Sequence, residues 1–460
     1  MIIDQIYTGC LAQGAYYIES DGEAAIVDPL RSPKPYLERA ANSGAKIKFI
    51  FETHFHADFV SGHLDLARES GATIVYGPGA RTDYEKIEAH DMQDFTVGKL
   101  TIRALHTPGH TLESTCYLLL DETGQPHALF SGDTLFIGDV GRPDLAQGGA
   151  LSKEDLAGLL YDSLRRRIMV LPDHVIVYPA HGAGSACGKK MSRETQDTLG
   201  NQKRSNYALR ADMTRAEFIR EVLDGLAPPP GYFSDNVRMN KQGYDAFAEV
   251  MGRGLRALPP RDFEAVANAQ RPLLLDVRDK AEFVRGFIPN SIFIGLDGSF
   301  APWVGEMIPD LGQAILLIAP EGRQAEAVER LSRVGFDNVL GYLAGGIAAW
   351  WDYGGEMDTI ETIAAATFGE RLADGRAVEV LDVRGEGEFA QGHLSMAKHQ
   401  PLNLLNRWQG ELDAERPYYV HCGSGYRSTI AASLLKARGF DRIVNVQDKV
   451  SLILEQEVSL

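Results

Sequence analysis

Two histidines and an aspartate alternate with other residues in the segment 53–58, at His54, His56 and Asp58. The apolar run Lys46–Phe51 before them predicts a short buried strand, so these side chains follow a strand end. Imidazole nitrogens together with a carboxylate are donors that suit a borderline transition metal. The spacing therefore predicts a metal site on the loop after this strand.

Three later donors occupy similar positions. His110, Asp133 and His181 each follow a predicted strand, and each lies beside a glycine in a loop. Strand ends that meet at one edge of a sheet bring their loops together, which is how α/β scaffolds assemble a site. One such histidine alone would be an ordinary hydrogen-bonded residue, whereas this set of placements favours a shared metal site.

A cysteine with a different chemistry opens the loop 422–428, between a predicted strand and a predicted helix over 429–437. In such a turn, backbone N–H groups and the helix N-terminus point at the sulfur, which lowers the thiol pKa and stabilises a persulfide anion. Gly423 and Gly425 permit positive φ values, and Arg427 adds positive charge. We therefore predict a sulfur carrier with Cys422 and Arg427 as catalytic residues. A protein tyrosine phosphatase loop has five residues between cysteine and arginine, whereas this loop has four.

The elements around this cysteine occur twice. The tetrapeptide Leu-Asp-Val-Arg at 275–278 recurs 106 residues later at 381–384, and both copies continue with Glu-Phe and a glycine. Apolar strands alternate with helices in each copy, with strands predicted over 272–277, 314–319, 378–383 and 418–422. We expect two small α/β modules with parallel sheets.

The first of these modules lacks the nucleophile. Its corresponding loop contains Ala319, Pro320 and Glu321 and no thiol. Pro320 has no N–H to offer, and Glu321 carries the wrong charge for holding an anion. We interpret this module as structural, as a docking spacer.

The first part of the chain alternates strands, helices and histidine-bearing loops. Strands are predicted over 23–27, 46–51, 73–76, 100–104, 115–120, 127–130 and 174–178. Three prolines at 228–230 followed by Gly231 predict a stiff connector, with a trailing helical segment after it. We place the domain boundaries at 1–253, 254–357 and 358–460.

Bulk composition limits the partners. The formal net charge of −17 has the wrong sign for a protein that holds nucleic acid or anionic lipid. No apolar run reaches the roughly 18 residues that suggest a membrane span, and Asp4 argues against a secretory signal. The four cysteines include no close pair, which fits a reducing cytoplasm. We expect a cytoplasmic protein of several domains that forms a homo-oligomer.

The metal-binding motifs resemble, in order and context, those of the metallo-β-lactamase superfamily. The matching residues are His54, His56, Asp58, His110, Asp133 and His181. The resemblance implies an α/β fold, an αββα sandwich, followed here by two rhodanese-like α/β domains. Most hydrolytic members, such as glyoxalase II, have a further histidine after the motif aspartate, which binds a second metal. This chain has Phe59 there, and its side chain has no donor atom, so we expect one metal.

Within that superfamily, the region resembles the persulfide dioxygenase branch. The resemblance implies that His54, His110 and Asp133 hold one Fe(II) per chain. Two imidazoles and a carboxylate form the triad of non-haem iron oxygenases, with open positions for O2 and substrate. The remaining motif residues would hydrogen-bond to metal-bound water. These are His56, Asp58 and His181.

The same resemblance suggests substrate-binding groups. The segment 138–144 resembles a loop that supplies an arginine to the carboxylate of a thiol carrier, so Arg142 is a candidate, with a surface salt bridge as the alternative. Relatives usually follow the last motif histidine with Asp-Tyr, whose tyrosine helps to hold glutathione, but this chain has Gly-Ala at 182–183. Lys189 and Lys190 are candidates for binding a phosphate-bearing carrier such as coenzyme A. Cys187 is a relay thiol or, as we prefer, a small loop residue.

The cysteine loop and its upstream Asp-Val-Arg and Glu-Phe motifs resemble a rhodanese, a thiosulfate or persulfide sulfurtransferase, over 358–447. The chain departs from that family afterwards, because the Gly-Gly and aromatic helix of the first copy, at 345–350, have no counterpart in the second. The packing of the last element is therefore left open.

Together the resemblances imply a persulfide dioxygenase fused to a sulfurtransferase. A low-molecular-weight thiol persulfide (of glutathione, coenzyme A or a similar thiol) and O2 would give sulfite and free thiol, in sulfide detoxification. Cys422 would exchange sulfane sulfur with sulfite and thiosulfate in either direction. The main alternative is a binuclear zinc thioester hydrolase of the glyoxalase II type with an appended rhodanese. A non-catalytic scaffold for sulfur delivery is the third hypothesis.

Overall fold

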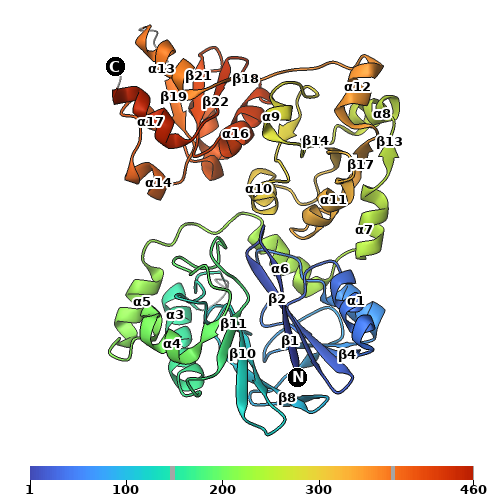
Figure 1. The fold of residues 1–460 in the computed structure, drawn as a ribbon, viewed down its shortest axis with the longest axis vertical. Helices are drawn as coiled ribbons and strands as arrows, with labels where there is room; N and C mark the ends of the chain where they lie inside the picture. The colour runs from blue at the N-terminus through green and yellow to red at the C-terminus, as the bar shows by residue number, and fades with distance from the viewer. Residues whose placement is uncertain (146–150, 375–378, 459–460) are drawn as a thin grey trace. The chain divides into compact units, whose positions relative to one another are not determined.

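The computed structural model describes residues 1–145, 151–374 and 379–458. The chain forms two compact units, which are coloured from blue to green and from yellow-green to red in Figure 1. The first unit comprises Met1–Ala248 with Ser332–Gly335, and the second comprises Glu249–Leu331 with Phe336–Leu460. Among the described residues, no helix is both long enough and apolar enough to cross a membrane.

Two six-stranded sheets form the centre of the first unit. In spatial order, the first sheet contains β1 (Ile2–Thr8), β2 (Gln13–Ser20), β3 (Glu23–Val27), β4 (Lys46–Phe51), β5 (Thr73–Tyr76) and β6 (Ile87–Glu88). The second contains β12 (Asp197–Thr198), β11 (Ile176–Pro179), β10 (Pro126–Gly132), β9 (Thr115–Leu120), β8 (Leu100–His106) and β7 (Asp94–Val97). Four predicted strands coincide with β3, β4, β5 and β9. The predicted strands near β8, β10 and β11 differ from them by a few residues at their ends.

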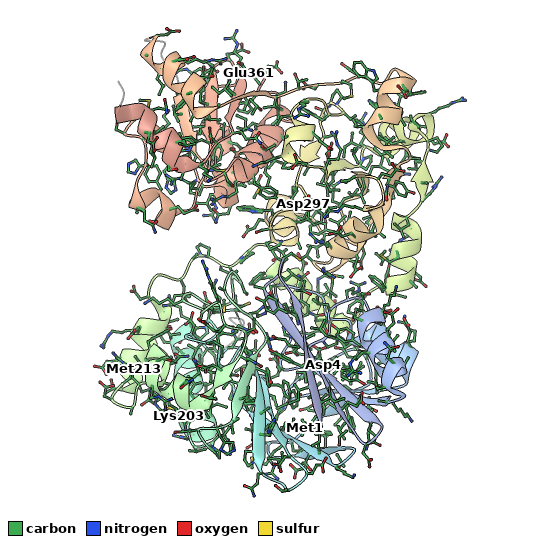
Figure 2. The ribbon with its side chains drawn as sticks, in the orientation of Figure 1. Met1, Asp4, Lys203, Met213, Asp297 and Glu361 are labelled. Carbon is green, nitrogen blue, oxygen red and sulfur yellow. The ribbon has the colours of Figure 1, made fainter. Side chains whose placement is uncertain are left out.

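The two sheets pack face to face because their strands alternate in the direction of their side chains. In β2, Tyr16 and Ile18 join the core between the sheets, where they meet Tyr117 and Phe130 of the second sheet. The neighbouring Tyr17 of β2 joins the core on the outer face. Figure 2 shows how densely side chains fill the sandwich.

Helices cover both outer faces of this sandwich. The apolar faces of α1 (Lys34–Ser43) and α2 (His63–Ser70) pack on the first sheet. Those of α3 (Lys153–Ser163), α4 (Leu199–Ser205) and α5 (Arg215–Leu223) pack on the second. The predicted αββα sandwich is confirmed. Two helices follow the proline-rich connector, α6 (Phe233–Gln242) and α7 (Phe247–Gly254).

The second unit contains two parallel five-stranded sheets with the same strand order. The first consists of β13 (Ala257–Leu258), β17 (Val339–Leu343), β16 (Ile315–Ile318), β14 (Leu273–Asp276) and β15 (Ile292–Phe293). The second consists of β18 (Glu361–Ile363), β22 (Ile443–Val446), β21 (Tyr418–His421), β19 (Glu379–Asp382) and β20 (Ala397–His399). The predicted pair of α/β modules is confirmed. Val378, at the start of one predicted strand, lies outside the described residues.

Helices flank each of these sheets. Those of the first module are α8 (Pro260–Gln270), α9 (Lys280–Phe283), α10 (Phe300–Met307), α11 (Gln324–Ser332) and α12 (Gly346–Tyr353). Those of the second are α13 (Ala365–Ala373), α14 (Glu386–Gln391), α15 (Leu405–Trp408), α16 (Tyr426–Lys436) and α17 (Val450–Val458). Short 3-10 or π turns occur at η1 (Leu164–Ile168), η2 (Tyr207–Leu209), η3 (Leu402–Leu404) and η4 (Gln409–Glu411).

The last helix shows how the second module closes without the Gly-Gly motif. In the first module α12 packs against α8, with Trp350 against Phe263. In the second, α17 packs against α13 in the same way, and Ile453 is fully buried beside Phe368. An apolar helix in the same place therefore closes the core despite the different sequence.

Candidate metal centre and cysteine loop

Six buried donor residues converge at the strand ends of the first unit. His54, His56 and Asp58 lie on the loop after β4. The other three donors are His110 after β8, Asp133 after β10 and His181 after β11. Because β4 belongs to one sheet and the other three strands to the second, the packing of the two sheets brings the six side chains together.

His54, His110 and Asp133 have ligand atoms within 4.8 Å of one another. Asp133 Oδ2 lies 3.4 Å from His110 Nε2 and 3.8 Å from His54 Nε2. Neither oxygen of Asp133 has a hydrogen-bond partner among the described residues, although both are buried. A buried carboxylate without partners is costly, so this donor set fits a metal cation held between the three side chains.

Hydrogen bonds orient both histidines of this triad. His110 Nδ1 lies 2.8 Å from the carbonyl oxygen of Arg142, so it donates its proton there. His54 Nδ1 lies 3.0 Å from Thr53 Oγ1, whose own proton goes to Asp28 Oδ2. The Nε2 lone pairs therefore face Asp133. Burial and the neighbouring histidines hold the pKa of His54 well below its ordinary value, which favours the neutral imidazole that ligates metals.

The other three donors form a second cluster, also within 4.8 Å. His181 Nε2 lies 3.4 Å from Asp58 Oδ2 and 3.7 Å from Asp133 Oδ1. Burial opposes charge on His181, but Asp58 and Asp133 outweigh it and raise the pKa of His181 well above its ordinary value. The Phe59 ring stacks on His56, with centroids 4.3 Å apart and planes 29° apart. An aromatic hydrocarbon therefore lies beside this cluster, at the position of the further histidine.

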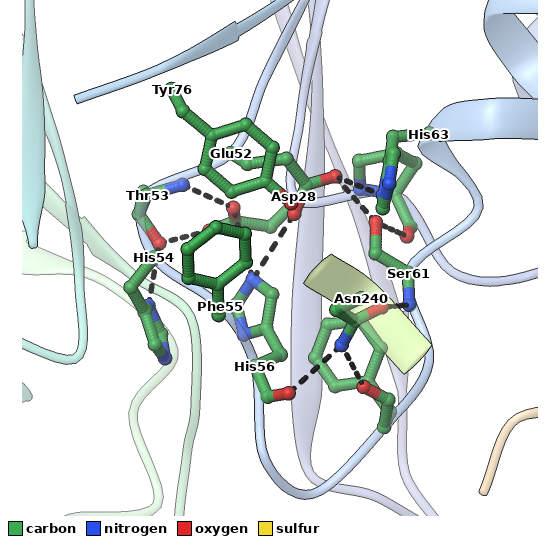
Figure 3. A network of polar contacts seen from close by, with 12 residues as sticks. Asp28, Glu52, Thr53, His54, Phe55, His56, Ser61, His63, Tyr76 and Asn240 are labelled. Carbon is green, nitrogen blue, oxygen red and sulfur yellow. Dashed lines mark hydrogen bonds and ion pairs between the residues drawn. The ribbon is translucent and has the colours of Figure 1, made fainter. Parts of the chain in front are cut away.

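His56 also belongs to a buried polar network with Asp28 and Glu52 (Figure 3). His56 Nε2 lies 3.1 Å from Asp28 Oδ1 and 3.6 Å from Glu52 Oε2. Burial and the charge of Asp28 raise the pKa of Glu52 well above its ordinary value, and Glu52 also accepts a hydrogen bond from Ser61 Oγ. One ring nitrogen of His56 is thus engaged by carboxyl groups rather than by the cluster.

Asn240 of α6 fixes the loop that carries these residues (Figure 3). Its side-chain amide donates to the carbonyl oxygens of His56 at 2.8 Å and Phe59 at 2.9 Å. The amide oxygen accepts from the N–H of Ser61 at 2.9 Å. The trailing helix therefore positions the loop with the candidate metal ligands, through a contact between residues about 180 positions apart.

Cys187 lies beside the candidate metal-binding side chains. Its sulfur belongs to a group with Asp133 and His181 whose ligand atoms lie within 4.8 Å, and the residue is buried. Burial is the main cause that raises the pKa of the Cys187 thiol to about 12. The sequence around Cys187 contains no recognisable metal-binding motif. The residue lies near Asp133 and His181 because the loop after His181 folds back toward them.

The predicted substrate-binding cations have internal partners. Arg142 is buried and donates to both oxygens of Asp144 at 2.7 Å and to the carbonyl oxygens of Ala186 and Ala227. Lys189 Nζ donates to two backbone carbonyls, of residues 221 and 224, and Lys190 Nζ lies over the Tyr207 ring. These side chains brace the loops around the site.

A cavity of about 330 Å³ lies beside the triad, with His110 in its wall. Its lining is mainly apolar, with Phe55, Leu112 and Val237 among the residues. Lys241 is the one lysine or arginine among the described lining residues, and its ammonium lies 5.0 Å from the Phe55 ring centroid. Sequence patterns did not single out Lys241, because it reaches the cavity from α6.

The cysteine loop joins β21 to α16. Cys422 is buried, and the N–H of Gly425 donates to its Sγ at 3.2 Å. The thiol also lies 3.7 Å from Ser428 Oγ, to which it donates. Gly425 has φ +90°, a left-handed conformation that glycine adopts without strain, and it caps the N-terminus of α16. The turn therefore aims an N–H and a helix N-terminus at the sulfur.

Arg427 braces this loop. Its guanidinium forms a bidentate ion pair with Glu388 of α14, at 2.5 and 2.7 Å, so the carboxylate offsets its charge. In the first module, the corresponding Arg323 pairs with Glu326 and Asp297, and no thiol is present in its loop.

Comparisons with known proteins match different families in the two parts of the chain. Residues 8–181 match the model of the metallo-beta-lactamase superfamily, and residues 260–353 and 364–449 match that of the rhodanese-like domain. A probable hydroxyacylglutathione hydrolase of Schizosaccharomyces pombe is 31% identical over 186 residues, which cover 40% of this chain and 68% of the relative. A hydroxyacylglutathione hydrolase of Tolumonas auensis is 36% identical over 170 residues, with 36% of this chain and 60% of the relative covered.

A solved structure covers more of the chain. The crystal structure of a metallo-beta-lactamase from Staphylococcus aureus is 32% identical, with a TM-score of 0.65. The match covers 75% of this chain and 98% of that one. The similarity therefore extends beyond the sandwich into the second unit.

Proposed function

The chain belongs to the metallo-beta-lactamase superfamily, with rhodanese-like domains after the sandwich, and from this premise we propose that it is a persulfide dioxygenase coupled to a sulfurtransferase. The first unit oxidises the persulfide of a low-molecular-weight thiol. One persulfide, one O2 and one water give one sulfite and the free thiol. Cys422 of the second unit exchanges sulfane sulfur with sulfite and thiosulfate.

The observation that carries the first half is the donor set beside Phe59. His54, His110 and Asp133 supply two imidazoles and one carboxylate, the triad of mononuclear non-haem iron enzymes. Bound Fe(II) would supply the electron transfer between sulfur and O2. Phe59 stacks on His56 and has no donor atom for a second metal, so we expect one metal per chain.

Three features of the site suit an anionic sulfur substrate: the orientation of the imidazoles, the cavity beside His110 and the charge of Lys241. The Arg142 carbonyl and Thr53 orient the two imidazoles, so that the Nε2 atoms of both rings are directed toward Asp133. The apolar cavity beside His110 would take the body of the carrier thiol and exclude bulk water. Lys241 in its wall offers a positive charge for a carboxylate or phosphate of that carrier.

The second half of the proposal rests on the loop of Cys422. The Gly425 N–H and the start of α16 point at Cys422 Sγ, and they would stabilise a terminal persulfide anion formed there. A sulfur-carrying loop on the same chain as the metal centre indicates that the oxidised substrate also contains sulfane sulfur.

The second candidate function is a metal-dependent thioester hydrolase, which the names of the hydroxyacylglutathione hydrolase relatives favour. The experiment that separates the two is metal analysis of the purified chain with O2 uptake on a panel of persulfides. We expect about one iron per chain and persulfide-dependent O2 uptake. Two zinc ions per chain with thioesterase activity and no O2 uptake would establish the hydrolase instead.

A further inference from the structure

The second unit contains a cavity of about 520 Å³ whose wall is shared by its two modules. The cysteine loop contributes Ser424, Tyr426 and Arg427 to this wall. The remaining lining comes from the module without a cysteine, including Lys280, Phe293 and Trp303. The two modules therefore meet at the loop that carries the nucleophile.

The module without a cysteine makes close contacts with the Cys422 loop. Tyr426 Oη donates to the carbonyl oxygen of Gly295 at 2.7 Å, and its ring lies 5.9 Å from that of Phe293 at 71°. Gly298 is required at this contact, because a Cβ there would lie 2.3 Å from the Tyr426 ring. Lys280 Nζ donates to the carbonyl oxygen of Ser424 at 2.5 Å.

Among the cationic side chains that line this cavity, Lys280 is the one without a carboxylate partner in the described parts of the chain. Arg278 is paired with Asp276, and Arg427 is paired with Glu388. No carboxylate pairs with Lys280 within the described parts of the chain. Its ammonium has three N–H donors, of which the Ser424 carbonyl takes one, so two remain for an anionic ligand.

The size of the cavity indicates the class of that ligand. Thiosulfate and sulfite are ions of a few atoms, whereas cavities of roughly 300–1,000 Å³ hold organic ligands. At about 520 Å³, with the rings of Phe293, Trp303 and Tyr426 in its wall, this cavity has room for the body of an organic thiol.

We infer that this cavity binds an anionic organic thiol persulfide as the sulfur donor to Cys422, and that Lys280 of the module without a cysteine holds its carboxylate or phosphate. The inference rests on the proposed sulfurtransferase function. The Cys422 thiolate attacks the terminal sulfur of the persulfide. A new S–S bond forms, the S–S bond of the donor breaks, and the carrier leaves as a thiolate while the proton stays on the transferred sulfur.

The first test uses the full chain without O2, so that the metal centre does not consume the persulfide. Sulfur transfer to sulfite is measured with glutathione persulfide and with the persulfide of uncharged 2-mercaptoethanol. Lys280→Gln should raise KM for glutathione persulfide about tenfold, which corresponds to about 1.4 kcal/mol. KM for the neutral donor and kcat for both should change little. Lys280→Arg should restore the wild-type KM, and Lys398→Gln, which removes a lysine paired with Glu379 outside the cavity, should have no effect.

An equal rise in KM for both donors would mean that Lys280 only supports the Ser424 backbone, and the inference would fail. It would fail equally if neither KM changed. If the wild-type chain transferred sulfur from no donor, the proposed sulfurtransferase would be wrong, which is a distinguishable result.

A binding measurement tests the site without turnover. In the Cys422→Ser chain, glutathione should change tryptophan fluorescence through Trp303 in the cavity wall. The change should be saturable, disappear when Trp303→Phe is added, and require higher glutathione concentrations when Lys280→Gln is added. A signal that survives Trp303→Phe unchanged would place the glutathione elsewhere and overturn the inference.

Discussion

At the scale of single residues, a hydrogen bond at Nδ1 decides which ring nitrogen of His54 and of His110 faces the candidate metal-binding donors. His54 and His110 use Nδ1 for Thr53 and the Arg142 carbonyl, which leaves Nε2 toward Asp133. His56 has the opposite arrangement, because its Nε2 faces Asp28 and Glu52. His54 and His56, two positions apart in the sequence, therefore direct their Nε2 atoms at different groups.

This difference predicts different outcomes for two sets of substitutions. His110→Ala and Asp133→Ala each remove a metal-binding atom and should abolish both iron binding and O2 uptake. His56→Ala should keep part of its iron, because the loss of outer partners typically weakens metal binding by about 10–100-fold. Iron content and O2 uptake are measured on the same preparations.

His174→Ala is the matched control, since His174 contacts only the Pro126 carbonyl among the partners described and is exposed. If His56→Ala strips the metal as completely as His110→Ala does, the triad has been assigned to the wrong residues.

At the scale of elements, the turn between β21 and α16 makes the difference between the two modules. In the second module the turn directs the Gly425 N–H at Cys422 Sγ. In the first module the corresponding turn contains Pro320 and Glu321, which remove an N–H and add a negative charge. The same strand order therefore supports one loop with a candidate sulfur-carrying cysteine and one module that contributes to the wall of a cavity.

Cys422→Ser should eliminate sulfur transfer from thiosulfate and spare O2 uptake on preformed persulfide, because serine fits the turn but holds no transferable sulfur. After brief exposure to thiosulfate, mass spectrometry should find one added sulfur atom, about 32 Da, on Cys422 of the unchanged chain. Cys10→Ser should retain this adduct. An adduct on Cys187 in the Cys422→Ser chain would instead identify Cys187, beside Asp133 and His181, as the carrier.

At the scale of the whole molecule, the two proposed chemistries use separate residues in separate units. The donor clusters and the cavity beside His110 are built from the first unit alone. The loop of Cys422 and the cavity of Lys280 are built from the second alone.

This separation predicts the effect of metal removal. A chelator that strips iron should abolish O2 uptake and leave sulfur transfer from thiosulfate unchanged, and Fe(II) added back without O2 should restore the uptake. The buried Asp133 oxygens lose their counter-charge without metal, so the Tm of the first unit should also fall. Loss of sulfur transfer together with the metal would show that the two sites depend on one another.

Local patterns in the sequence determined much of this protein. The period of apolar residues predicted β3, β4, β5 and β9 at their observed bounds, and the repeated motif predicted two parallel modules. The motif donors could be recognised because each follows a strand, and a strand end restricts where the next side chain lies. The same holds for Cys422, whose strand, glycines and helix are neighbours along the chain.

Contacts between distant residues were decided only by the tertiary structure. Cys187 beside Asp133, Asn240 on the His56 loop and Lys280 on the Cys422 loop join residues that no local pattern links. The pairing of Arg427 with Glu388 is of the same kind. Their positions depend on how helices and sheets pack, because packing satisfies buried charges and fills volume across the whole fold, whereas backbone propensity acts only between near neighbours.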